Sequence, residues 1–96
     1  MITTKQRATL RKIASTYLPL MQIGKDTLKD ESIKQIEEML EKRELIKIRV
    51  LNNCSLSTKQ VAILIAERTN CDIVQTIGNI IVLFRPSSRT DIKHIL

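Results

Sequence analysis

Apolar residues recur along the 96-residue chain at two spacings. Three segments repeat them every three or four positions, as on the buried side of a helix, while four shorter segments alternate them or run them together, as in strands. The predicted helices are capped by Thr3 or Thr4, by Asp30 and by Ser57, and they end near Tyr17, Arg43 and Thr69. The predicted strands cover residues 20–23, 45–51, 72–77 and 80–85. This α-β-α-β-α-β-β order predicts one α/β domain over residues 1–88 and a polar tail over residues 89–96.

The same pattern predicts the core and the strand directions. The helical stripes comprise Leu10, Ile13, Ala14 and Tyr17, then Ile33, Ile36, Met39 and Leu40, then Val61, Leu64 and Ile65 with Arg68 at the related spacing. Gly78 and Asn79 favour a two-residue hairpin turn. The helical crossovers are expected to join parallel strands, and the hairpin adds an antiparallel one. The apolar run over residues 80–84 predicts a strand covered on both faces.

The charge of the chain indicates a polyanionic partner. Sixteen Lys and Arg against ten Asp and Glu give a net charge of +6. Residues 1–29 carry six basic and one acidic side chain, residues 30–44 three and six, and residues 45–96 seven and three. One segment is therefore acidic between two basic ones, so we expect the positive charge to gather on one face of the molecule.

The residue inventory argues against several classes of protein. No apolar run approaches the length of a membrane span, and the N-terminus lacks an apolar signal core, so we expect a cytoplasmic protein. Cys54 and Cys71 are interpreted as reduced thiols, and the single histidine, His94, cannot build a metal site alone. The chain has neither a GxxxxGK[ST] loop nor a GxGxxG loop. We therefore predict no cofactor, no metal, no small-molecule substrate and no enzymatic activity.

A strand, a turn and a helix start follow one another in the segment LMQIGKDTLKDES. Gly24, directly after the strand, can adopt backbone angles that other residues avoid, and its missing side chain lets a ligand come close. Lys25 and Lys29 place positive charge beside the free amides of the following helix. The segment is either a clamp for a sugar–phosphate backbone or a plain turn with solvated lysines.

Four blocks in order, KQRATLRKIA, LPLMQIGKDTL, ELIKIRVLNN and VQTIGNIIVLFRPS, resemble the CRM domain family, in particular its small stand-alone bacterial YhbY-like members. The resemblance spans residues 4–88. It implies a four-stranded mixed sheet similar to the C-terminal domain of translation initiation factor three. It also implies RNA binding in the maturation of the large ribosomal subunit. The family's GxxG loop maps onto Gly24, Lys25, Asp26 and Thr27, with Thr27 standing in place of the second glycine.

Basic residues outside the loop extend the predicted RNA surface. Lys5, Arg7, Arg11 and Lys12 on the first helix form the densest cluster. Lys47 and Arg49 share one strand face, where they either reach RNA or cover the flank of the first helix with their stems. Arg85 and Arg89 either extend this surface or serve solubility. Tyr17 and Phe84 are the only aromatic residues and fit the core, so we predict recognition of phosphates and RNA shape with little reading of bases.

The leading hypothesis is a monomeric, non-catalytic protein that binds ribosomal RNA in large-subunit precursors and assists their assembly, with no membrane partner. The alternatives are a binder of another structured RNA, an adaptor whose basic surface meets an acidic protein, and an undetected enzyme acting on RNA. The acidic second helix is expected to face away from RNA or toward a basic ribosomal protein.

Overall fold

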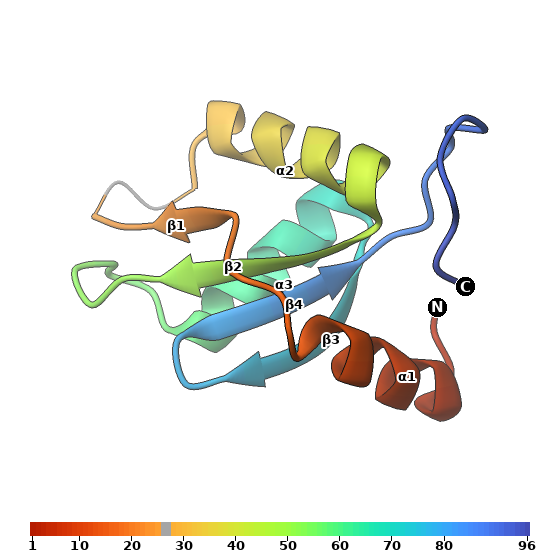
Figure 1. Cartoon of the computed structure of the whole chain (residues 1–96). Helices are drawn as coiled ribbons and strands as arrows, with labels where there is room; N and C mark the ends of the chain where they lie inside the picture. Colours follow the sequence, from red (N-terminus) through yellow and green to blue (C-terminus); the bar gives the residue numbers. More distant parts are fainter. Residues whose placement is uncertain (26–27) are drawn as a thin grey trace.

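The computed structural model describes residues 1–25 and 28–96. Its helices are α1 (Thr4–Ala14), α2 (Asp30–Arg43) and α3 (Thr58–Thr69), and its strands are β1 (Met21–Ile23), β2 (Leu45–Val50), β3 (Asp72–Ile77) and β4 (Ile80–Phe84). The predicted order of seven elements is confirmed, and so is the α/β class with a mixed sheet of four strands (Figure 1).

The strands lie in the order β1-β2-β4-β3. β1 runs parallel to β2, whereas β4 runs antiparallel to both β2 and β3. β4 therefore sits inside the sheet, as its apolar run predicts, and separates the two strands that the second crossover joins. Gly78 in the β3–β4 hairpin has a φ of +55°, a region that glycine enters at little cost.

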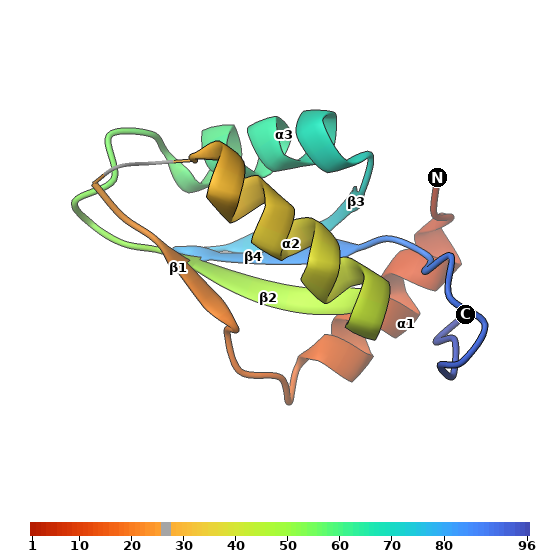
Figure 2. The ribbon, with the colours of Figure 1, turned by 90° about the horizontal axis from the view of Figure 1, so that it is seen from above.

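The sheet has a different helical cover on each face (Figure 2). α2 and α3 pack on one face with a buried cluster that includes Ile36, Ile48 and Ile81. α1 packs on the other face, where Leu10 and Ala14 contact a smaller cluster that includes Phe84. The sequence pattern does not tell which face each helix covers, because an amphipathic helix fits either side of a sheet that is apolar on both.

Three local expectations about the helices are wrong. α1 ends at Ala14 and not near Tyr17, because the chain turns at Ser15. The Tyr17 amide donates to the Ala14 carbonyl at 2.9 Å in this turn. Lys29, rather than Asp30, occupies the N-cap of α2, while the Asp30 carboxylate accepts from Arg68 at 2.8 Å. In α3 the buried residues are Val61, Ala62, Ile65 and Thr69, and Leu64 is 38% exposed. The expected Ser57 cap of α3 is confirmed and forms a capping box with Gln60.

Candidate nucleic-acid interface

α1 covers only one end of its sheet face. It packs where β2 begins and β4 ends, against Leu45 and Phe84, which are partners in the sheet register. Toward the other end the sheet carries two further rows of side chains, which we call the open rows, although Val82 in the second of them is still buried in the α1 cluster. The outer row crosses all four strands through Gln22, Arg49, Ile80 and Ile77. The inner row consists of Lys47, Val82 and Gln75.

Three cations of α1 are exposed, namely Lys5, Arg11 and Lys12. Arg11 and Lys12 line a hollow beside the inner row, together with Lys47. Lys5 lies two helical turns earlier, roughly 10 Å along the helix axis from Lys12. The structure therefore brings Arg11 and Lys12, but not Lys5, to the open part of the sheet.

Arg7 has a structural position that the sequence pattern does not indicate. The register of β3 against β4 shifts between Ile73 and Gln75, as in a β-bulge. Arg7 Nη1 donates to the carbonyl oxygen of Ile73 and, at 3.0 Å, to that of Val74. Its side chain is half-buried. Arg7 thus binds α1 to carbonyl groups at the bulge, which places it apart from the exposed cations.

The two basic residues of β2 differ in their surroundings. Lys47 is half-buried, and its Nζ donates to the carbonyl oxygen of Tyr17, just beyond the end of α1, at 3.1 Å. Arg49 is exposed in the outer row. Tyr17 packs against the smaller cluster and Phe84 is buried, so both aromatic rings belong to the core as predicted.

The loops after β1 and β2 meet at the open end of the sheet. The Leu51 amide donates to the Ile23 carbonyl at 2.8 Å, and the Val50 amide donates to the hairpin residue Asn79 at 2.7 Å. A Cβ on Gly24 would lie 3.3 Å from the side-chain oxygen of Asn53. The backbone of Gly24 is not in the left-handed region, so the loop does not use the angles that glycine alone adopts easily, and the small size of Gly24 admits the side chain of Asn53.

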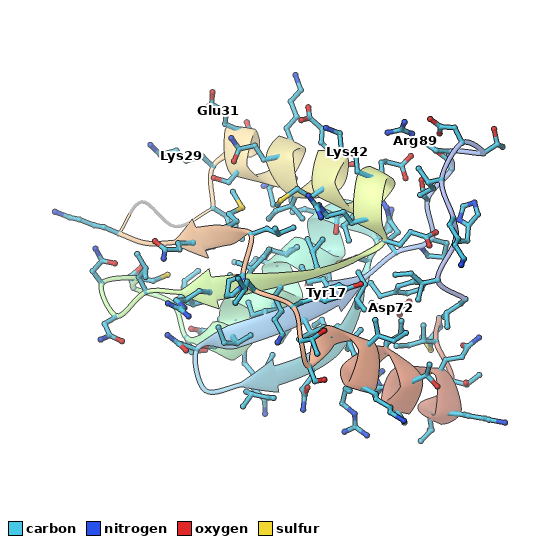
Figure 3. The ribbon with its side chains drawn as sticks, viewed as in Figure 1. Tyr17, Lys29, Glu31, Lys42, Asp72 and Arg89 are labelled. Carbon is cyan, nitrogen blue, oxygen red and sulfur yellow. The ribbon has the colours of Figure 1, made fainter. Side chains whose placement is uncertain are left out.

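Two lysines flank the loop between β1 and α2. Lys25 is exposed directly after Gly24. Asp26 and Thr27, the other two positions of the GxxG-like loop, lie outside the described residues. Lys29 lies beside Glu31 where α2 begins, at the same end of the molecule as the β1 loop (Figure 3).

Acidic residues are divided unevenly between the two faces of the sheet. α1 carries four basic residues and no acidic one, and the open rows add Lys47 and Arg49. Six of the ten acidic residues lie on the other side, in α2 and α3: Asp30, Glu31, Glu37, Glu38, Glu41 and Glu67. Within the described ranges 1–25 and 28–96, no carboxylate lies within 4 Å of Arg11, Lys12 or Arg49. These cations keep their charge available for an external anion.

A family model and several known proteins match nearly the whole chain. The family model described as the CRS1 / YhbY (CRM) domain matches residues 2–85. The chain belongs to the CRS1/YhbY (CRM) domain family. It is 46% identical over 87 residues to "Probable RNA-binding protein YqeI" of Bacillus subtilis, with 91% of each chain covered. It is 37% identical over 93 residues to a Haemophilus influenzae protein named "RNA-binding protein", covering 96% of this chain and 93% of that one.

A solved structure carries the same fold as this CRM domain. The solution structure of SAV1595 from Staphylococcus aureus, described as a candidate RNA-binding protein, superposes with a TM-score of 0.79. The two chains are 42% identical, and the match covers 95% of each. The family that the four sequence blocks resemble is therefore confirmed, together with its fold.

Not every basic residue of the CRM domain faces the open rows. Arg85 connects the end of β4 with both α3 and α2. Its guanidinium donates to the Thr69 carbonyl at 2.8 Å and lies 3.7 Å from the carboxylates of Glu37 and Glu41. Arg89 pairs with Asp91 at 2.6 Å. Figure 3 shows Arg89 in the tail, near the end of α2 that carries Lys42. The idea that Arg85 and Arg89 extend the RNA surface is not supported, because acidic partners already neutralise both.

The tail is tied to the CRM domain by Glu44, which sequence reasoning did not single out. Glu44 is 1% exposed and has a φ of +65°. Its carboxylate accepts from the amides of Ser87 and Ile95 at 2.7 and 2.8 Å, and His94 Nδ1 lies 2.7 Å away. The hydrogen bonds and charge of His94, with the two amides, hold the pKa of Glu44 below its usual value despite burial, and Glu44 raises the pKa of His94. We call this arrangement the Glu44 latch.

The remaining chemistry of the CRM domain is sparse. Cys54 and Cys71 are both free thiols, and burial raises the pKa of Cys71. Among the described residues, no group of three or more His, Cys, Asp or Glu side chains is arranged to hold a metal ion. The same residues include no helix with the length and apolar character needed to cross a membrane.

Proposed function

We propose that this CRM domain binds structured RNA with the face that carries α1 and the open rows. The observation that carries the proposal is the distribution of acidic residues: α1 and the open rows contain none beside exposed Arg11, Lys12 and Arg49, whereas six of the ten lie in α2 and α3 on the opposite side. Basic side chains that neutralise phosphates supply most of the affinity of such proteins. The names of the relatives, which are called RNA-binding proteins, support the same function.

The RNA that we propose is ribosomal RNA in precursors of the large subunit. The support is the resemblance to the stand-alone bacterial YhbY-like members, with which this chain shares length and element order. On this proposal the protein is a cytoplasmic monomer without catalytic activity, and it holds or shields an RNA conformation during assembly. Lys25 and Lys29 would contact RNA beside the open end, and Lys5 would contact it further along α1.

Sucrose-gradient sedimentation of a tagged copy, at low and at moderate salt, tests this proposal. We expect the protein to migrate with large-subunit precursors at low salt and to leave them on addition of salt, because phosphate contacts weaken as salt rises. Treatment with RNase is expected to release it as well. A protein that stays at the top of the gradient in both salts would contradict the ribosomal assignment. An association that survives RNase would favour the protein adaptor instead.

A further inference from the structure

A hollow of about 540 Å³ lies between the second half of α1 and the open rows. Four elements contribute to its lining, so no short sequence motif marks it. Its walls are formed by Arg11, Lys12, Ala14 and Ser15 of the first helix and its cap, Lys47 of β2, Gln75 and Ile77 of β3, and Ile80 and Val82 of β4. The hollow is therefore part of the same face that carries the cations without acidic partners.

The floor of the hollow is apolar, and its exposed part comes from Ile77 and Ile80, because Val82 is buried. Ile77, Ile80 and Val82 lie on adjacent antiparallel strands, with Ile77 directly paired to Ile80. Ile77 is 57% exposed, so a ligand that covers it would remove apolar surface from water. A planar, weakly polar group laid on this floor would remove the apolar surface from water.

One wall of the hollow offers a hydrogen-bonding edge. Gln75 is half-buried between the floor and α1. In the part of the chain that the structure describes, the hydrogen bonds and ion pairs leave its side-chain amide without a protein partner. An amide presents a donor and an acceptor side by side, which matches the donor and acceptor edge of a nucleobase, adenine in particular.

The α1 side of the hollow is positive. Arg11 and Lys12 are exposed on α1, and no carboxylate within residues 1–25 and 28–96 pairs with either. An apolar floor, an amide without a protein partner among the described residues and two cations in one hollow match the base and the phosphate of a nucleotide. Duplex RNA keeps its bases stacked inside, so only an unpaired nucleotide can enter such a site.

We propose that this hollow receives one unpaired nucleotide of the bound RNA, with its base on Ile77 and Ile80, its base edge on Gln75 and its phosphate on Arg11 and Lys12. This inference rests on the proposed RNA binding and adds one site of base recognition to it. A protein that reads mainly phosphates and shape would thereby prefer structured RNA with a bulged or looped-out base at the right place.

Two RNA hairpins test the site by their dissociation constants. Both contain a one-nucleotide bulge, which is adenosine in one hairpin and an abasic ribose in the other, so the number of phosphates is the same. We expect the unaltered chain to bind the adenosine hairpin at least about fivefold more tightly. Gln75→Leu, which removes the amide, and Ile77→Ser, which shortens an exposed part of the floor, are each expected to reduce that ratio toward one.

Gln35→Leu is the matched control, because Gln35 is an exposed glutamine on α2, on the opposite face. It is expected to keep the full ratio, and melting temperatures confirm that each variant folds. Equal binding of both hairpins by the unaltered chain would overturn the nucleotide site and leave the proposed function standing. A ratio that persists in folded Gln75→Leu and Ile77→Ser would also overturn it. Failure to bind either hairpin at low salt would contradict the proposed function itself.

Discussion

Replacing Arg11, Lys12 and Arg49 together by glutamine is expected to weaken binding to an RNA hairpin on the order of a hundredfold at 0.1 M salt. Each phosphate contact contributes a slope of about −0.9 to the dependence of log affinity on log salt, so three lost contacts should reduce the slope by about two to three. The three side chains are exposed and, within the described residues, have no acidic partner. The free energy of unfolding should therefore change little. Fluorescence anisotropy over a series of salt concentrations measures both the affinity and the slope.

A control variant with the same change of net charge distinguishes RNA binding by one face from attraction between RNA and the net positive charge of the protein. Lys34, Lys42 and Lys59 are exposed on α2 and α3, on the other side of the sheet. Their joint replacement by glutamine is expected to reduce affinity by a much smaller factor and to leave most of the slope. Equal losses for the two triple variants would mean that net charge, rather than the α1 face, governs binding.

Glu44→Gln is expected to lower the free energy of unfolding by about 2 kcal/mol. The Glu44 carboxylate is buried and accepts from two backbone amides, from Ser87 and Ile95, on its two oxygens. A glutamine has one acceptor oxygen, so its amide nitrogen would face a donor, and one buried backbone amide would lose its partner. The residue also holds a positive φ, which these hydrogen bonds stabilise against its steric cost. Denaturant unfolding measures the difference.

Glu38→Gln is the matched control for Glu44→Gln, because Glu38 is exposed on α2. It is expected to change the free energy of unfolding by less than about 0.5 kcal/mol. If both variants unfold at the same denaturant concentration, the Glu44 latch contributes nothing to stability.

The Glu44 latch also gives stability a dependence on pH. The pKa of Glu44 is lowered, so its contribution is present above its usual pKa of 4.5 and is lost as the pH falls through the folded value. The pKa of His94 is raised, so its contribution is fully present below 6.5 and is lost as the pH rises through the folded value. The stability difference between the unaltered chain and His94→Gln should therefore be larger near pH 5.5 than near pH 8. A difference that does not change between these pH values would contradict the charged pair.

Most of the secondary structure could be predicted from short stretches of sequence. The Ser57 cap, the Gly78–Asn79 turn and the bounds of β3 each depend on a few neighbouring residues, and all three were predictable. The placement of α1 on its own face and of β4 between β2 and β3 depends on contacts between distant segments. Apolar periodicity gives the buried side of an element but not its partner, so these features required the structure.

The candidate site was predictable only in part, for the same reason. Arg11, Lys12 and Arg49 could be chosen from charge alone, and they meet on one face. Arg7 looked equivalent to Arg11 on the helix surface, but a bulge 66 residues later in the chain supplies its carbonyl partners. Gln75 lies in a strand without any motif, and only the structure shows that it lines one hollow with Arg11 and Lys12.

Amide chemical shifts of the labelled chain, recorded by NMR during titration with an RNA hairpin, test most directly whether this face binds RNA. We expect the shifts to concentrate in the second half of α1, in the open rows and in the loops beside them at residues 24–25, 52–53 and 78–79. The outer faces of α2 and α3 should change little. Shifts centred on α2 and α3, with the open rows unaffected, would contradict this expectation.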